Sequence, residues 1–300
     1  MMLITLILYY AGWFFTIALA AAGRPFTAAL ACLLAGSSQL LIHYFYTRSG
    51  YYREIFLALY AVLIGFFAES FFLNVSITGF NPPGLIASLP PLWIVLLYPL
   101  FSMTINGAMH WMMNSKILQV IVGGLAPICY IAGAKVGACQ LPRGSVAAYI
   151  VIGITWPLVI LTMTTLLKKI EILVESVFKK SQTPTPLYML YDGKCPICMR
   201  ETRFLKKKNS SVVYVDITSP EFTSLFSVNY AEAMQQMVAL EADGTKHVGV
   251  DAFHEIYLRR GLLFMAIALK LPGLEPIWTF FYKIFAKNRL KLTGRGCDLR

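Results

Sequence analysis

Two cysteines separated by two residues, Cys195 and Cys198, are the side chains of this sequence best suited to chemistry. They follow a short apolar run, residues 187–191, and a turn at Asp192 and Gly193. This order predicts a strand, a tight turn and a helix that begins at the cysteines. A helix N-terminus stabilises a thiolate through its free backbone N–H groups and the positive end of its dipole. The spacing therefore indicates thiol–disulfide exchange.

The neighbours of the two cysteines indicate separate roles for them. Cys195, at the start of the helix, is expected to be the exposed attacking thiolate, and Cys198, one turn deeper, the thiol that resolves the mixed disulfide. Lys194 adds positive potential beside the first thiol. Pro196 suits the first helical turn, where its missing N–H would have had no partner. Asp192 is expected to cap the helix or to accept the proton of Cys198, and capping is the preferred interpretation.

The residues beyond the cysteines alternate in the pattern of a small α/β domain, in which a sheet carries helices on its faces. Asp251 is expected to cap a helix that begins at residue 252. The apolar stretch near the C-terminus is interrupted by charges and prolines, so it predicts two amphipathic helices, not another membrane span. The predicted strands are residues 187–191, 212–217, 237–241 and 247–250, and the predicted helices are residues 196–208, 231–236, 262–270 and 276–286.

The first half of the chain has a different composition. Hydrophobic residues make up 57% of the 300 residues, and Glu54 and Glu69 are the only acids before residue 168. The net charge of +11 raises the question of nucleic-acid binding. The sequence has no basic motif interleaved with aromatic residues, so we expect no nucleic-acid partner. Anionic headgroups explain basic residues beside membrane spans, so we expect membrane lipids as partners.

Six apolar segments are long enough to cross a bilayer as helices. The fifth contains Gly123, Gly124 and Pro127 and is expected to be broken or re-entrant, which makes five spans the alternative count. Lys and Arg gather in the loops that are cytoplasmic if both termini are inside, so we expect a cytoplasmic second half. The six segments are residues 3–22, 26–46, 55–74, 91–113, 117–134 and 146–167.

Four polar residues in or beside these spans are candidates for a membrane site, because burying them in lipid is costly. Asn106 and His110 are one helical turn apart and are expected to share a face of the fourth span. Glu69 is expected at a different depth, with Lys135 as its partner. Interhelical hydrogen bonding or ion pairing is the preferred interpretation, and a transport or catalytic role is the alternative.

A helical extension broken by prolines near residues 181–186 marks the boundary between the halves. We expect a polytopic α-helical membrane domain over residues 1–167, a linker over 168–186 and a thioredoxin-like α/β domain over 187–300.

The second half resembles the DCC family of thiol-disulfide oxidoreductases, which is named for its Asp-x-x-Cys-x-x-Cys spacing. Asp192, Cys195 and Cys198 carry that spacing here, and residues 249–253, 271–273 and 285–289 provide further matches. The resemblance implies a redox dithiol that exchanges electrons with a protein thiol or disulfide, without a cofactor. Thioredoxin-fold enzymes usually have a cis-proline facing the dithiol. Residues 234–237, which correspond to it, contain no proline, so this sequence departs from the usual pattern there.

The first half resembles an uncharacterised bacterial membrane family, the domain of unknown function 2878. Residues 89–93 and 123–137 carry most of the likeness, together with Phe101, Thr104 and Trp111. The resemblance implies a multi-span protein of the bacterial inner membrane and indicates no activity.

Two functions remain open. The first is a membrane-tethered thiol–disulfide oxidoreductase that uses Cys195 and Cys198. The second is a transporter or scaffold whose cysteine domain is a redox or metal sensor. A zinc site would have to combine the two thiols with His247 or His254 and Cys297, and the absence of a second Cys-x-x-Cys pair favours no metal.

Overall fold

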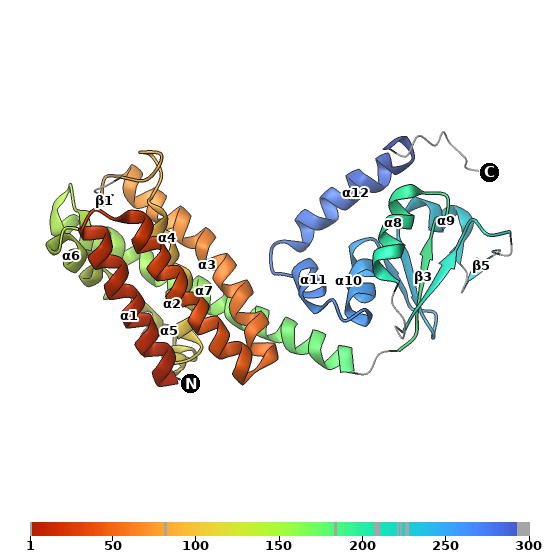
Figure 1. Ribbon diagram of the computed structural model, residues 1–300, viewed down its shortest axis with the longest axis horizontal. Helices are drawn as coiled ribbons and strands as arrows, with labels where there is room; N and C mark the ends of the chain where they lie inside the picture. The colour runs from red at the N-terminus through yellow and green to blue at the C-terminus, as the bar shows by residue number, and fades with distance from the viewer. Residues whose placement is uncertain are drawn as a thin grey trace. The chain divides into compact units, whose positions relative to one another are not determined.

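The computed structural model describes residues 2–80, 83–182, 185–206, 211–220, 222, 224–225 and 228–292. The chain divides into two compact units, Met1–Glu171 and Ile172–Arg300. Each has its own set of elements (Figure 1). Cys297 lies outside the described residues.

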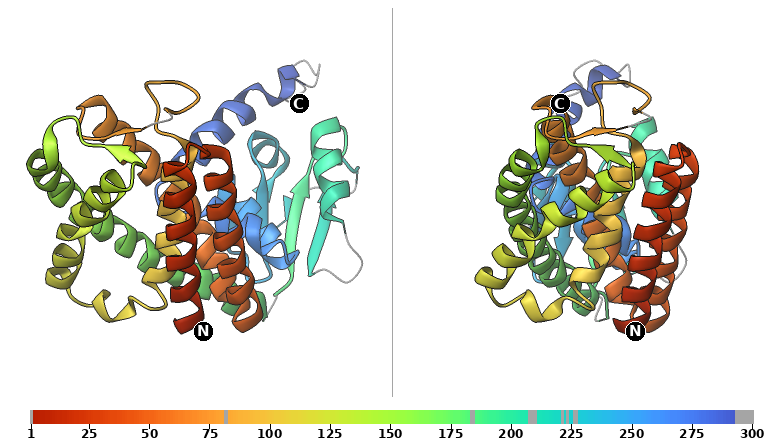
Figure 2. Two further views of the ribbon diagram at one scale, coloured as in Figure 1. Left: turned by 60° about the vertical axis from the view of Figure 1, so that its left-hand side comes forward. Right: turned by 90° about the vertical axis from the view of Figure 1, so that its left-hand side faces the viewer.

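The first unit consists of apolar helices. Large hydrophobic side chains are exposed along them, including Phe15, Phe45 and Phe67, as expected of surfaces that face lipid. α1 and α2 lie side by side in both views of Figure 2. The elements of the first unit are α1 (Met2–Ala21), α2 (Pro25–Tyr46), α3 (Arg48–Asn74), β1 (Gly79–Phe80), α4 (Leu92–Ile105), η1 (His110–Met112), α5 (Lys116–Gly124), α6 (Ala126–Lys135), β2 (Cys139–Gln140) and the first part of α7 (Gly144–Gln182).

Five segments among the described residues are long and apolar enough to cross a membrane, by length and composition. The predicted fourth span holds a shorter apolar helix, α4. α4 has 14 residues and is about 21 Å long, less than the ~30 Å of a hydrocarbon core. Asn106 and Gly107 follow it in a turn, where such residues are favoured. The five segments are Leu3–Ala21, Pro25–Tyr46, Arg48–Asn74, Lys116–Lys135 and Gly144–Gln182.

The predicted break in the fifth span is confirmed, because α5 ends at Gly124 and α6 begins at Ala126. Gly123 packs directly against α7: a Cβ at this position would lie 2.5 Å from the backbone nitrogen of Pro157. Pro127 stands in the first turn of α6, where it removes no helical hydrogen bond. The glycine therefore permits close packing of two helices, and the proline starts the second half of the broken segment.

The second unit contains a four-stranded mixed sheet in the order β4-β3-β7-β8, as expected of a thioredoxin-like domain. β3 is central, parallel to β4 and antiparallel to β7, and β7 and β8 pair antiparallel as a hairpin. Figure 1 shows α8 (Pro196–Leu205) and α9 (Tyr230–Gln235) beside the sheet. The strands are β3 (Leu187–Tyr191), β4 (Val212–Asp216), β7 (Val238–Glu241) and β8 (Lys246–Val248), with a small separate pair formed by β5 (Ser224–Leu225) and β6 (Val228–Asn229).

Side chains of the sheet enter two hydrophobic clusters, because successive residues of a strand point to opposite faces. Leu187 and Met189 of β3 pack in one cluster with Ile256 of the helix α10. Leu190 packs in the other with Met234 of the helix α9. Helices therefore cover both faces of β3, and the strand leads into the turn that holds the cysteines. The helices are α8 (Pro196–Leu205), α9 (Tyr230–Gln235), α10 (Val250–Arg259), α11 (Leu263–Leu269) and α12 (Glu275–Leu292).

Several helix boundaries differ from the sequence-based expectation by one to six residues, and two of the differences have a clear physical cause. α10 begins at Val250, and its N-cap is Gly249 with a φ of 59°, a conformation that favours glycine. Asp251 is therefore inside the first turn, where it pairs with Lys270, and is not the cap. α12 continues to Leu292, beyond the predicted end at residue 286, because no glycine or proline interrupts residues 277–292.

Candidate functional site: a buried dithiol at a helix N-terminus

The turn between β3 and α8 is fixed by the carboxylate of Asp192. Its Oδ1 accepts the backbone N–H of Lys194 at 3.0 Å, and its backbone carbonyl accepts the N–H of Cys195 at 3.2 Å. This is a local Asx turn, a common use of aspartate where a chain reverses. Asp192 itself is 1% exposed. The preferred prediction, that Asp192 caps the helix, is wrong: Asp192 orders the turn before the helix, and the N-cap of α8 is Cys195.

The second support of the turn is Asp216 at the end of β4, which the sequence did not reveal. Its Oδ1 accepts the backbone N–H groups of Gly193 at 3.0 Å and Thr218 at 2.8 Å. A Cβ on Gly193 would lie 2.0 Å from Asp216 Oδ2, so only glycine fits against this carboxylate. Desolvation raises the pKa of Asp216, but the hydrogen bonds from Thr218 and Gly193 and the charge of Lys194 lower it more, and the pKa falls below its usual value.

Cys195 is the N-cap of α8, and its Sγ accepts the backbone N–H of Cys198 at 3.3 Å. This contact stabilises negative charge on the first sulfur, as the sequence predicted for a helix N-terminus. Cys195 is 1% exposed and Cys198 8% exposed, so the expectation of an exposed attacking thiol is wrong for this conformation. Pro196 stands in the first turn of the helix as predicted, and Lys194 is exposed beside it.

Arg289 of α12 is the main residue of the site that the sequence did not assign. It is buried, its Nη1 donates to Cys198 Sγ at 3.8 Å, and its Nη2 donates to the carbonyl of Met234 at 2.6 Å. Burial and the hydrogen bond to Cys195 raise the pKa of Cys198 to about 12, while the charge of Arg289 opposes that rise. Cys198 therefore holds its proton while Cys195 accepts hydrogen bonds.

A groove of about 420 Å³ lies beside the second thiol, lined by Cys198, Arg289 and apolar residues of α10 and α12. Tyr282 of α12 accepts the backbone N–H of Met237 at 2.7 Å. Met237 ends the segment in which a cis-proline was expected. In this protein the Tyr282 hydroxyl therefore accepts the hydrogen bond of the backbone N–H just before β7, next to the dithiol.

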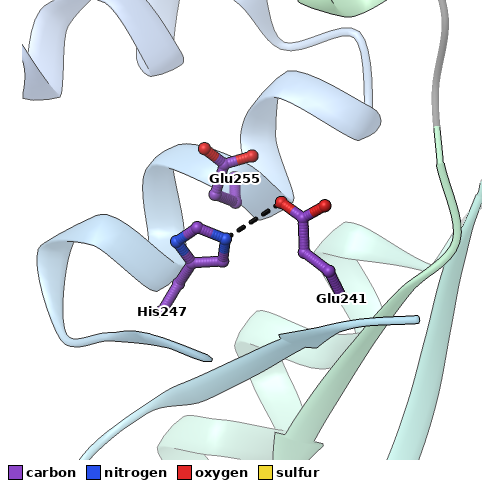
Figure 3. A group of neighbouring side chains, drawn as sticks. All are labelled: Glu241, His247 and Glu255. Atoms are coloured by element: carbon purple, nitrogen blue, oxygen red, sulfur yellow. Dashed lines mark hydrogen bonds and ion pairs between the residues drawn. The ribbon is translucent and has the colours of Figure 1, made fainter. Parts of the chain in front are cut away.

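A separate group of potential metal ligands consists of Glu241, His247 and Glu255, which come from β7, β8 and α10 (Figure 3). The donor atoms lie within 4.8 Å of one another. Both carboxylates already pair with cations: Arg259 contacts each of them, and Lys180 lies 2.7 Å from Glu255. Two positive side chains offset the two carboxylates, so the group forms an ion-pair network with little charge left to attract a metal.

The zinc alternative for the dithiol gains no support. Among the described residues, no histidine joins the two cysteines in a group of three potential ligands. His247 contacts Glu241 at 3.0 Å, and His254 contacts the carbonyl of Ala266 at 2.9 Å.

The four polar membrane candidates do not form one site. Glu69 is completely buried and accepts hydrogen bonds from Tyr98, at 2.8 Å, and from Tyr130. The prediction that Lys135 pairs with Glu69 is wrong, because Lys135 is exposed and no ion pair joins them in the described part of the chain. Aromatic hydroxyls supply the hydrogen bonds instead, a partnership that sequence spacing did not indicate.

Asn106 and His110 are also separated. Asn106 caps the end of α4 and donates to Glu54 at 3.1 Å, and Glu54 also accepts from Arg53 at 3.3 Å. His110 is exposed in the 3₁₀ turn η1. The two do not share a helical face, because α4 ends before either of them. Asn106 therefore has the interhelical role that the sequence favoured, with Glu54 as a partner it did not identify.

Comparison with known proteins identifies both halves of the chain. A family described as DCC1-like thiol-disulfide oxidoreductase matches residues 189–295, and one described as protein of unknown function (DUF2878) matches residues 2–162. An uncharacterised chloroplastic protein of Arabidopsis thaliana is 33% identical over 126 residues, which cover 39% of this chain and 59% of that relative. No solved structure matches. The chain therefore belongs to the DUF2878 family, and its second half carries a DCC1-like thiol-disulfide oxidoreductase domain.

Proposed function

We propose that the protein is a membrane-tethered thiol–disulfide oxidoreductase that reduces a disulfide of another protein through Cys195 and Cys198. The observation that carries the proposal is the hydrogen bond of 3.3 Å from the Cys198 N–H to Cys195 Sγ at the N-terminus of α8. The contact gives the first sulfur the electrostatic support that a nucleophilic thiolate needs. The apolar helices of the first half would hold this chemistry at a bilayer.

The reaction proceeds in two exchanges. The Cys195 thiolate attacks one sulfur of the substrate disulfide, forming a mixed disulfide and releasing the other sulfur as a thiolate, which takes up a proton. Cys198 then loses its proton and attacks Cys195 Sγ, which releases the second substrate thiol and leaves a Cys195–Cys198 disulfide. The substrate gains two electrons and the dithiol loses two.

Arg289 acts in the second exchange. Cys198 must ionise before it attacks, and its pKa of about 12 opposes this. The Arg289 guanidinium, 3.8 Å from the sulfur, stabilises the thiolate as it forms. Asp192 and Gly193 are positioning residues, since they fix the turn that presents the helix N-terminus.

The direction of electron flow follows from the compartment we infer. Lys and Arg beside the predicted spans favour a cytoplasmic second half, in the inner membrane of a bacterium. A dithiol in the cytoplasm faces a reducing thiol pool, which would keep it reduced and ready to donate electrons.

Trapping tests the proposal. Full-length protein with Cys198→Ser should accumulate a mixed disulfide through Cys195, because the resolving thiol is missing. Cys195→Ser together with Cys198→Ser should trap nothing, and Cys32→Ser, which alters a buried membrane thiol, should leave trapping by the Cys198→Ser protein unchanged. Absence of a reducible adduct on Cys195, under conditions in which that thiol is accessible to a small alkylating reagent, would refute exchange through this dithiol.

The alternative function, a transporter or scaffold regulated by the cysteine domain, is favoured by the buried Glu54 and Glu69 in the first unit. Replacing both cysteines should then alter a transport or binding activity of the membrane unit without abolishing it. Under the oxidoreductase proposal the same change removes all activity.

A further inference from the structure

The first unit contains a cavity of about 340 Å³ between α1, α4, α6 and α7, within the usual size range of small-molecule sites. Nine of the 21 residues that line it are aromatic, against 14% of the whole chain. Trp13, Trp93 and Trp156 are among them. Aromatic walls of this kind favour ring compounds, which pack against them face to edge or offset.

The cavity has an exposed rim and a buried floor. Tyr10 is 53% exposed and Leu125 51% exposed, whereas Tyr98 is 1% and Tyr130 7% exposed. The rim belongs to helices whose outer surfaces are apolar and suited to face lipid. A ligand would therefore enter from the bilayer and must itself be soluble in lipid.

The floor is polar. Tyr98 and Tyr130 both donate their hydroxyl protons to Oε1 of Glu69, and the indole N–H of Trp156 donates to the Tyr130 hydroxyl at 3.2 Å. Oε2 of Glu69 has no hydrogen-bond partner among the described residues. A tyrosine hydroxyl that has donated its proton can still accept hydrogen bonds. The floor thus presents acceptors and selects a ligand that carries a donor.

We infer that this cavity binds a lipid-soluble phenol or hydroquinone, with its ring between the aromatic walls and its hydroxyl donating to Tyr98 at the floor. A ketone or an ether of the same size lacks the proton that the floor needs. A simple acyl chain lacks the ring that the walls favour. This inference is independent of the dithiol.

The full-length protein in detergent micelles can be titrated with nonylphenol, with its methyl ether and with nonanol, while tryptophan fluorescence is recorded. Trp13, Trp93 and Trp156 line the cavity and report its occupation. We expect saturable binding of nonylphenol, and binding of the ether about fivefold weaker, as for the loss of one neutral hydrogen bond.

Tyr98→Phe should weaken nonylphenol about fivefold and leave the ether unchanged, because it removes the acceptor. Tyr149→Phe, which changes an exposed tyrosine outside the cavity, should change neither affinity. Equal binding of phenol and ether by the unaltered protein would overturn the inference. So would equal binding of nonanol and nonylphenol, which would identify the cavity as a site for acyl chains, and so would the absence of saturable binding.

Discussion

Replacing Arg289 with methionine should make Cys198 harder to ionise. The guanidinium lies 3.8 Å from Cys198 Sγ and is buried. Two unit charges at that distance interact by about 4 kcal/mol at an effective dielectric constant of about 20. One pKa unit corresponds to about 1.4 kcal/mol, so about three units is the upper limit. Arg289 also donates to the Met234 carbonyl, and the side chains around Cys198 relax in the variant, so the effect should be smaller than this limit. We expect the pKa of Cys198 to rise by about two units.

The rate of alkylation reports this rise. A pKa two units higher lowers the thiolate fraction about 100-fold, and the greater intrinsic nucleophilicity of the more basic thiolate restores about tenfold. Iodoacetamide should therefore modify Cys198 about tenfold more slowly at neutral pH. The comparison is made in full-length protein with Cys195→Ser, so that one thiol of the pair is followed, and mass spectrometry assigns the modified residue.

Two control variants separate charge from structure. Arg289→Lys keeps the positive charge and should retain most of the rate, whereas Lys287→Met removes an exposed charge from the same helix and should have no effect. Thermal unfolding verifies that each variant is folded. If Arg289→Met alkylates Cys198 as fast as the control, the guanidinium does not stabilise the thiolate. If the variant reacts faster, Arg289 acts as a latch that restricts access, and the electrostatic argument fails.

Three further changes test the packing around the turn and α12. Gly193→Ala should destabilise the second unit by about 1–3 kcal/mol in thermal unfolding, because its Cβ would lie 2.0 Å from Asp216, whereas Gly124→Ala has open space and should be neutral. The pKa of Asp216 is lowered in the folded protein, so its stabilising effect is present above its usual pKa and is lost as the pH falls through the folded-state pKa. Asp216→Asn should therefore unfold more easily at neutral pH. On acidification this variant should lose less stability than the unaltered protein. Equal acid sensitivity would contradict that assignment. Tyr282→Phe removes the hydroxyl that accepts the Met237 N–H and should speed alkylation of Cys198 about threefold to tenfold if α12 limits access; an unchanged rate would show that it does not.

The sequence predicted the sheet and the helix N-terminus because both depend on local patterns. A short apolar run defines β3, and the Asp-Gly turn followed by Cys-Pro places Cys195 at the start of α8. Such signals extend over a few residues, and no distant part of the chain is needed to interpret them.

Contacts between distant residues could not be predicted in this way. Arg289 is 91 positions beyond Cys198, so no local spacing connects the two residues. Glu69 was expected to pair with a cation, but buried tyrosine hydroxyls 29 and 61 positions away donate to its Oε1. The burial of Cys195 also depends on tertiary packing, since the same local sequence could hold an exposed thiol.

The groove and the helix N-terminus favour different thiols as the nucleophile. Cys198 lines the groove, so a substrate that enters there would reach it first. Yet a thiol with a pKa of about 12 is ionised in roughly one molecule in 10⁵ at pH 7. Low ionisation therefore disfavours Cys198 as the first nucleophile, whereas the backbone N–H of Cys198 supports negative charge on Cys195 Sγ. Cys195 remains the expected nucleophile, and a substrate must reach a side chain that is 1% exposed.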